Sequence, residues 1–320
     1  MTRVPSVGPD APARVLVTGA AGFIGRALIA ELLTRPAVER VIALVHRRAL
    51  PCLPETGAGL ETHAIDLRDE AAVAAVLAQT RPHVVINAAS RGVNPGEGDP
   101  AGLFALNVAA AVSVHQRAEA ALARRFIHLG SCAEYGSSET PLDEEAPLRP
   151  ESAYGATKAA ASVILRQAAE TAAPDAMETV VLRLFNQWGP GEAPHRFVPA
   201  LLEACERGTV FPMTAGGQVK DYSYVGDTAA WIADLALRPG RLGVPVINLA
   251  SGRPGPLRDF ARAVVAAAGA PPEVLGLGHL PYRPGDPMLN AADTRRLDAL
   301  LPARRHTPLA RGVAALRAGR

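Results

Sequence analysis

A glycine-rich loop near the start of the chain constrains the fold most. The loop reads Gly19-Ala20-Ala21-Gly22-Phe23-Ile24-Gly25, and it lies between an apolar run at 14–18 and a predicted helix at 25–33. Glycines at this spacing permit a tight turn and let backbone N–H groups approach a pyrophosphate at a helix N-terminus. Because a strand precedes the loop and a helix follows it, we expect Gly19, Gly22, Phe23, Ile24 and Gly25 to bind a dinucleotide.

Short apolar strands and helical stretches alternate along the chain. The predicted strands are 14–18, 41–45, 60–66, 83–88, 125–131, 179–185 and 246–249, and the predicted helices are 25–33, 70–78, 102–124, 154–173 and 227–237. Strands that are apolar throughout and alternate with helices are typical of a parallel sheet covered on both faces. We therefore expect an α/β protein with a doubly wound parallel sheet (a Rossmann fold) and a smaller C-terminal substrate-binding lobe.

The composition of the sequence changes after Asn186, where proline, glycine and arginine become frequent. The expected dinucleotide-binding domain comprises 13–185 and 222–251, and the expected substrate-binding lobe comprises 186–221 and 252–320. Residues 1–12 are polar and are expected to form a flexible tail, with no apolar signal segment.

Composition excludes several classes of protein. The formal net charge of +2 over 320 residues gives no support to nucleic-acid binding, and acidic residues interrupt the arginine-rich C-terminal stretch. No apolar run approaches the roughly 18 residues of a membrane span. The three cysteines are scattered and the histidines lack ligand spacing, so no metal is assigned. These features predict a cytoplasmic protein that binds neither membrane nor nucleic acid.

Tyr154 and Lys158 are four positions apart in a chain that has only two lysines. Four residues make about one helical turn, so the phenol and the ammonium share a helix face. An ammonium beside a phenol favours the phenolate, which predicts a lowered pKa for Tyr154. Such a tyrosine can exchange a proton with a substrate hydroxyl or carbonyl. The spacing alone leaves open an exposed helical pair without function.

The second predicted strand ends without the carboxylate that NAD-binding proteins place on the ribose 2′-hydroxyl. The sequence there is Leu44-Val45-His46-Arg47-Arg48. Arg47 and Arg48 can hold a 2′-phosphate through planar, bidentate contacts. The pair predicts NADP(H) in preference to NAD(H), with two solvated loop arginines as the alternative.

Together these motifs resemble those of the extended short-chain dehydrogenase/reductase family, which includes nucleotide-sugar epimerases, dehydratases and 4-keto reductases. The resemblance covers nearly the whole chain. It rests on the glycine loop, GSCAEYG at 130–136, Tyr154 with Lys158, RLFNQWGPG at 183–191, KDYSYVGD at 220–227, NLASG at 248–252 and RPGD at 283–286. Lys220 stands where the family usually has arginine.

The resemblance implies a mechanism and further site residues. Hydride would pass between the nicotinamide and a sugar carbon while Tyr154 exchanges the proton on the sugar oxygen. Ser131, Tyr154 and Lys158 would be catalytic, with Asn107 supporting the lysine through its backbone. The implied dinucleotide contacts are Asp66, Leu67, Ala88, Ala89, Tyr154, Lys158 and Phe185, and the implied substrate contacts are Ser131, Cys132, Asn186, Lys220 and Arg283.

The residues after Ser131 separate the reactions of the family. Its dehydratases carry an acidic pair where this chain has Cys132 and Ala133, and Glu134 lies one position further on. Its 3,5-epimerase/reductases need a cysteine where Ala133 stands. The predicted function is therefore NADPH-dependent reduction of the 4-keto group of a nucleotide-activated 4-keto-6-deoxyhexose. An NAD-retaining 4-epimerase is one alternative, and a non-catalytic dinucleotide-binding sensor or scaffold is another.

The resemblance also implies a homodimer. The predicted helices 102–124 and 154–173 correspond to those that form an intermolecular four-helix bundle in dimers of the family. Their alanine-rich faces would allow the helices to pack closely.

Overall fold

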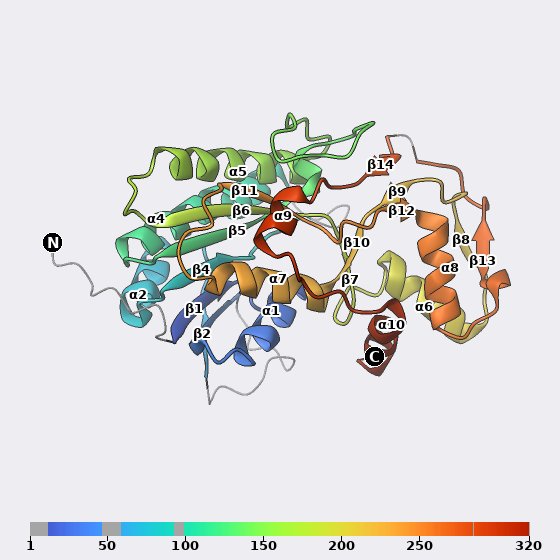
Figure 1. The fold of residues 1–320 in the computed structure, drawn as a ribbon, viewed down its shortest axis with the longest axis horizontal. Coiled ribbons are helices and arrows are strands. Elements are labelled where there is room, and N and C mark those ends of the chain that lie inside the picture. The colour runs from blue at the N-terminus through green and yellow to red at the C-terminus, as the bar shows by residue number, and fades with distance from the viewer. Residues whose placement is uncertain (1–11, 47–58, 93–98, 284, 320) are drawn as a thin grey trace. The chain divides into compact units, whose positions relative to one another are not determined.

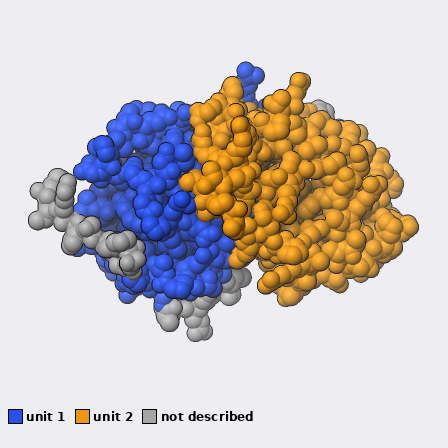
Figure 2. Space-filling view, viewed as in Figure 1, with its two compact units in different colours: residues 1–134, 148–183, 229–247 blue, residues 135–147, 184–228, 248–320 orange. Residues whose placement is uncertain are grey.

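The structure is a computed structural model that describes residues 12–46, 59–92, 99–283 and 285–319. It divides into two compact units (Figure 2). Unit 1 comprises Met1–Glu134, Leu148–Arg183 and Ala229–Ile247, and unit 2 comprises Tyr135–Pro147, Leu184–Thr228 and Asn248–Arg320. The division expected from the sequence did not set residues 135–147 apart from the dinucleotide-binding domain, whereas these residues cluster with unit 2 here.

The central sheet has seven strands. They are β1 (Ala13–Thr18), β2 (Val38–Val45), β3 (Leu60–Ala64), β4 (Val84–Asn87), β5 (Arg125–Ser131), β6 (Glu178–Leu184) and β11 (Val246–Leu249). Their order is β11-β6-β5-β4-β1-β2-β3, and β3, β2, β1, β4 and β5 pair in parallel. Crossover connections on either side of β1 confirm the doubly wound α/β fold.

Helices cover both faces of this sheet (Figure 1). The helical segments are α1 (Phe23–Leu33), α2 (Glu70–Thr80), α3 (Pro100–Phe104), η1 (Ala105–Ala110), α4 (Ala111–Ala120), η2 (Cys132–Glu134), α5 (Ala153–Thr171) and α7 (Val225–Leu237). Helices α2, α4 and α5 pack side by side on one face, and α1 and α7 lie on the other. Alternate residues of the strands, such as Ile42 and Val85, pack against Val114 and Leu165 of the helices in a fully buried core.

One predicted helix differs from the structure. The sequence predicts a continuous helix over 102–124, whereas the structure has α3, a π-helical turn η1 and then α4. Asn107 lies in the π-helical turn, where its side chain bonds to the backbone of Arg91 and to Thr157. A π-helical turn inside an α-helix often marks a functional site.

Unit 2 is built from short elements around its own core. They are β7 (Asn186–Trp188), α6 (Phe197–Arg207), β8 (Phe211–Met213), β9 (Val219–Lys220), β10 (Tyr222–Tyr224), β12 (Gly255–Pro256), α8 (Leu257–Ala267), η3 (Pro272–Val274), β13 (Leu275–Leu277), β14 (Leu289–Asn290), α9 (Arg295–Leu300) and α10 (Leu309–Ala318). The strands pair as β10-β7, β12-β9-β14 and β13-β8. Apolar residues of α6, α8 and α10 form the core, and Tyr222 stacks on Phe260 with ring centroids 4.2 Å apart.

A buried ion pair joins the first residue of β5 to the first residue of β6 in unit 1. The Arg125 Nε donates to the Glu178 carboxylate over 2.8 Å, and both side chains are almost fully buried. The other guanidinium nitrogens of Arg125 donate to four backbone carbonyls between Leu235 and Gly240, and Glu178 accepts from the N–H groups of Leu242 and Gly243. The pair therefore fixes the turn that follows α7.

We expect the substitution Arg125→Met to lower the free energy of unfolding by about 3–5 kcal/mol, because it leaves a buried carboxylate without its partner. Arg40→Met is the matched control, since Arg40 pairs with Glu61 at the surface and should change stability by about 0–1 kcal/mol. Denaturant unfolding of both variants measures the difference. Equal effects would show that the Arg125 pair contributes no more than a surface pair.

Candidate active site

The glycine loop closes tightly after β1. Gly19 has φ 62°, and a Cβ at this residue would lie 2.7 Å from the Ala89 backbone. A Cβ at Gly25 would lie 2.2 Å from the Gly19 carbonyl oxygen. Gly22 precedes α1 as its N-cap and, as a glycine, has no side chain that could cap the first turn of the helix. This uncapped N-terminus fits a pyrophosphate, because its N–H groups and the helix dipole both favour an anion.

Tyr154 and Ser131 meet at the carboxyl end of β5. Tyr154 lies in the first turn of α5, whose N-cap Ser152 accepts a hydrogen bond from the Gly155 N–H. The Tyr154 phenol lies within hydrogen-bonding reach of the Ser131 and Ser90 side chains, and the residue is half-buried. The structure thus brings together the two predicted proton-handling residues, and it adds Ser90, which the sequence analysis missed.

The predicted lowering of the Tyr154 pKa was wrong for this structure. Burial of the phenol raises its pKa, and the hydrogen bonds with Ser131 and Ser90 only partly offset this effect. Lys158, on the same helix, instead donates to the Leu129 carbonyl and lies 3.3 Å from His128 Nε2. Because its amine is directed toward these β5 groups, Tyr154 is held as a neutral phenol.

Lys158 itself is buried within unit 1. Only 1% of the residue is exposed, and burial lowers the pKa of its amine to about 8, although the nearby Glu134 carboxyl favours the ammonium. A lysine in this range is partly deprotonated near physiological pH. The family resemblance implied this residue as the partner of Tyr154, but gave no indication that its amine is desolvated.

Asn107 ties the loop after β4 to α5. Its side chain accepts from the Arg91 N–H and donates to the Arg91 carbonyl, each over 3.0 Å. It also donates to Thr157 Oγ1, which donates to the Tyr154 carbonyl. This network positions the first turn of α5, and with it Tyr154. The predicted backbone support of Lys158 by Asn107 stays a prediction.

A second buried ion pair lies directly behind Ser131. Glu134 is fully buried; it accepts from the Ser131 N–H with one oxygen and from Arg183 Nε with the other, each over 2.8 Å. A Cβ on Gly130 would lie 2.6 Å from the Glu134 carboxylate, so the strand requires glycine there. Burial raises the pKa of Glu134, while Arg183 and Lys158 oppose that rise. Glu134 therefore acts on the position of Ser131.

The remaining predicted residues of unit 1 have local partners. Asp66 forms a bidentate ion pair with Arg68, which holds the pKa of the Asp66 carboxyl well below its usual range, and Leu67 is buried. The Ala89 N–H donates to Thr18 Oγ1, so the Ala88-Ala89 turn is bonded to the end of β1. Cys132 is a half-buried cysteine outside any disulfide, close enough to act electrostatically on Tyr154. Arg47 and Arg48 lie outside the described residues.

Four predicted residues belong to unit 2. Phe185 is buried, and Asn186 donates to the Asp221 carbonyl over 3.2 Å. Lys220 donates to the Pro287 carbonyl and lies 3.8 Å from Asp286. Arg283 is exposed. Their contacts with a substrate stay predictions.

Glu192 is a site candidate of unit 2 that the sequence analysis missed. Its side chain is 7% exposed, and its Oε2 has no hydrogen-bond partner within the described part of the chain. Burial raises its pKa to about 7, and it acts electrostatically on the Tyr222 phenol. The glutamate directly follows the GPG sequence at 189–191, which was the available signal.

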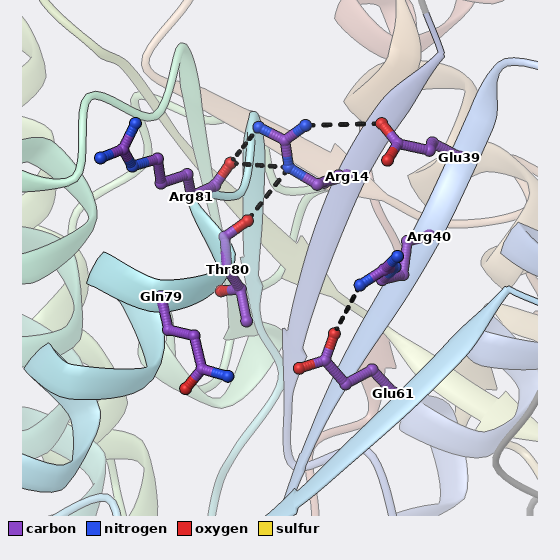
Figure 3. Close-up of a pocket in the computed structure, with 7 residues that line it drawn as sticks. All are labelled: Arg14, Glu39, Arg40, Glu61, Gln79, Thr80 and Arg81. Atoms are coloured by element: carbon purple, nitrogen blue, oxygen red, sulfur yellow. Dashed lines mark hydrogen bonds and ion pairs between the residues drawn. The ribbon is translucent and has the colours of Figure 1, made fainter.

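A polar cavity of about 250 Å³ lies elsewhere in unit 1, at the amino ends of β1–β3 (Figure 3). Arg14 pairs with Glu39 and Arg40 pairs with Glu61 in its wall. The glycine loop and Tyr154 lie at the carboxyl ends of parallel strands, where ligands of this fold bind. The cavity is therefore not the candidate active site.

Comparison with known proteins agrees with this geometry. The family model of the NAD-dependent epimerase/dehydratase family matches residues 15–250. The chain belongs to this family. Its relatives are nucleotide-sugar 4-ketoreductases, dehydratases and epimerases of the extended short-chain dehydrogenase/reductase type, and the protein is an NAD(P)-dependent enzyme of that type.

Two bacterial relatives are similar over most of their length. The chain is 32% identical to dTDP-6-deoxy-L-talose 4-dehydrogenase (NAD(P)(+)) of Kitasatospora kifunensis, with 82% of each chain covered. It is 30% identical to a probable dTDP-4,6-dihydroxy-2-methyloxan-3-one 4-ketoreductase of Streptomyces antibioticus, with 94% of this chain and 100% of the relative covered.

A solved structure is similar in both fold and sequence. The structure of MoeE5 in complex with UDP-glucuronic acid and NAD superimposes with a TM-score of 0.78 at 30% identity, and covers 94% of this chain and 97% of the other. Within the described ranges, no helix is long and apolar enough to cross a membrane. The same ranges contain no group of three histidine, cysteine or acidic side chains placed to hold a metal.

We expect Gly25→Ala to weaken dinucleotide binding at least about tenfold, a loss of roughly 1.4 kcal/mol, because the added Cβ would overlap the Gly19 carbonyl and displace the loop. Gly255→Ala is the control, since a Cβ there meets no atom within 4 Å. Titration calorimetry with NAD and NADP on both variants measures the loss. Unchanged affinity in Gly25→Ala would show that this loop does not hold the dinucleotide.

Proposed function

We propose that the protein reduces the 4-keto group of a nucleotide-activated 4-keto-6-deoxyhexose. The observation that carries the proposal is that the Tyr154 phenol and Ser131 come together at the carboxyl end of β5, within hydrogen-bonding reach of each other. Burial raises the pKa of the phenol, which favours its protonated form, and that form can donate to a carbonyl oxygen. The two bacterial relatives named as a 4-dehydrogenase and a 4-ketoreductase support the same position on the sugar.

In the proposed reaction, each of four residues of unit 1 has a separate role. A nicotinamide cofactor supplies the hydride when bound. Tyr154 donates its phenolic proton to the sugar oxygen, while Ser131 hydrogen-bonds that oxygen as negative charge develops on it. Glu134 fixes the backbone of Ser131, and Asn107 fixes the first turn of α5 through Thr157. The donors are thus oriented before the substrate arrives.

Elimination of water is disfavoured by the same environment. Cys132 and Ala133 carry no carboxyl group, and the neighbouring Glu134 is fully buried and paired with Arg183. Its carboxyl therefore cannot approach a sugar carbon without breaking this pair. An NAD-retaining 4-epimerase remains the second candidate, supported by the epimerases among the relatives.

The choice of NADPH over NADH rests on Arg47 and Arg48. Two guanidinium groups after β2 would bind a 2′-phosphate through charge-assisted hydrogen bonds. Asp66, the described carboxylate that lies 3.7 Å from His46 after β2, is already paired with Arg68. We propose that the enzyme exchanges NADP(H) with each turnover.

We expect the enzyme to oxidise one NADPH per 4-keto-6-deoxy nucleotide sugar reduced, and to use NADH less efficiently. Tyr154→Phe should lower kcat about 10²- to 10⁴-fold while dinucleotide binding persists, because only the proton donor is lost. Absorbance of the reduced nicotinamide and chromatography of the sugar product measure both. Tightly co-purifying NAD with redox-neutral epimerisation would contradict the proposal in favour of the epimerase.

We further propose that the protein forms a homodimer through a bundle of four helices. In α3 and α5, Phe104, Val163 and Ile164 are large apolar side chains that are 56%, 54% and 43% exposed. Helices α4 and α5 pack against each other on one face of the sheet. A second copy of α5 and of the helical segment from α3 to α4 would cover these side chains and complete the bundle.

We expect Val163→Glu to convert the dimer into a monomer, because it places a charge in the covered apolar face. Val210→Glu is the matched control, since Val210 is equally exposed but lies in unit 2. Sedimentation of the wild type and both variants at micromolar concentration measures the change. A monomeric wild type, or dissociation by both variants alike, would contradict this interface.

A further inference from the structure

A chain of buried polar groups runs through unit 1 from the glycine loop to Lys158. The Ala89 N–H donates to Thr18 Oγ1 over 3.2 Å, and Thr18 Oγ1 donates to Asn87 Oδ1 over 2.5 Å. Asn87 Nδ2 lies 3.0 Å from His128 Nδ1, and His128 Nε2 lies 3.3 Å from Lys158 Nζ. Thr18, Asn87, His128 and Lys158 are each 0–1% exposed. We refer to Ala89, Thr18, Asn87, His128 and Lys158 as the polar chain.

The direction of the hydrogen bonds along the polar chain follows from its first members. A backbone N–H can only donate, so the Ala89 N–H uses the Thr18 oxygen as acceptor. Asn87 Oδ1 is the one acceptor for the Thr18 hydroxyl among the described residues. This fixes the Asn87 amide with its Nδ2 toward His128, so His128 Nδ1 must accept. The ring proton of His128 therefore lies on Nε2.

The opposite direction leaves a buried group unpaired. If the Asn87 amide were reversed, its nitrogen would donate to Thr18, which already accepts from the Ala89 N–H. The Thr18 hydroxyl proton would then lose its acceptor at a position with no exposed surface. Unpaired donors are unfavourable in a buried site, so the packing selects the first arrangement.

This arrangement directs an N–H group at the Lys158 amine. An ammonium has three donors and no acceptor, whereas a neutral amine has a lone pair that can accept from His128 Nε2–H. The amine can still donate to the Leu129 carbonyl. The polar chain therefore favours the neutral form of Lys158, in the same direction as its burial.

The titratable groups around the polar chain have opposite effects on the protonation of Lys158. Glu134, paired with Arg183, favours the ammonium of Lys158. The pKa of His128 is well below its usual range because of burial first, then Lys158 and His115, so the imidazole is neutral. The state of Lys158 is thus a balance between a carboxylate in η2 and an imidazole in β5.

We propose that His128 is a positioning residue which, with its proton on Nε2, donates to the Lys158 amine, so that Thr18 and Asn87 set how much of Lys158 is protonated. The importance of Lys158 for turnover rests on the proposed function, but its protonation does not. Thr18 and Ala89 adjoin the glycine loop, since Gly19 packs on the Ala89 backbone.

The test measures the titration of Lys158 directly in the full chain. Lysine labelled with carbon-13 at Cε gives two resonances, because the chain has only Lys158 and Lys220, and Lys220→Arg assigns them. We expect Thr18→Val to raise the Lys158 pKa by about one unit, a tenfold change in the ratio of ammonium to amine. Without the hydroxyl, the Asn87 amide is free to reverse and His128 Nε2 becomes an acceptor.

Thr18→Ser is the matched control, because it keeps the hydroxyl and should leave the Lys158 pKa unchanged. An unchanged or lowered pKa in Thr18→Val, or equal shifts in both variants, would overturn the proposal. The Lys220 resonance serves as an internal reference for general changes in the protein.

A second measurement determines the His128 tautomer in the wild-type protein, so it does not depend on the folding of a Thr18 variant. Nitrogen-15 spectra of histidine-labelled wild type distinguish the two ring tautomers, and His128→Phe identifies the His128 signals. A proton on Nε2 is expected, and a proton on Nδ1 would overturn the proposal. Neither measurement depends on turnover. Absence of 4-keto reduction would therefore refute the proposed function, but it would not contradict the proposed hydrogen bond from His128 to Lys158.

In active enzyme, Thr18→Val should shift the Lys158-dependent limb of the kcat–pH profile by about one pH unit, the same amount as the expected rise in the Lys158 pKa.

Discussion

The candidate active site depends on the buried ion pair between Glu134 and Arg183. Burying two charges is costly, and this cost is offset here because each carboxylate oxygen has a donor at 2.8 Å. One of those donors is the Ser131 N–H, so the pair holds Ser131, the serine proposed to bind the substrate oxygen, through its backbone. The carboxylate leaves no space for a side chain at Gly130 and partly compensates the buried amine of Lys158. The Glu134 carboxylate thus interacts with β5, with the Ser131 backbone and with the Lys158 amine at once.

Burial gives the Tyr154–Lys158 pair a different meaning from the one that its spacing suggests. One helical turn places phenol and amine on the same face, which predicts an activated phenolate. In the structure, desolvation disfavours the charged form of both groups, so the pKa of Tyr154 is raised and that of Lys158 is lowered. A neutral phenol suits proton donation to a ketone, which agrees with the reductive direction that we propose.

Much of unit 1 could be predicted from the sequence. The strands at 125–131 and 246–249 have the predicted bounds, and the glycine loop joins β1 to α1 as its motif indicates. The π-helical turn at Asn107 was not predicted, because the apolar pattern over 102–124 is that of a continuous helix. The Asn107 side chain bonds there to Arg91 and Thr157, which lie apart from it in the sequence and come together only in the tertiary structure. Ser90 was missed for the same reason, since its contact with Tyr154 exists only once β4 and α5 are packed.

The sequence by itself determined the family, the order of strands and helices, and the residue types of the proposed proton relay, because these depend on local spacing and hydrophobic pattern. Only the tertiary structure decided the charge state that surrounds the relay. His128 reads in the sequence as one residue of an apolar strand, and Glu134 as a displaced acid. Packing removes both from water and places them beside Lys158, and the loss of solvation then controls which groups carry protons.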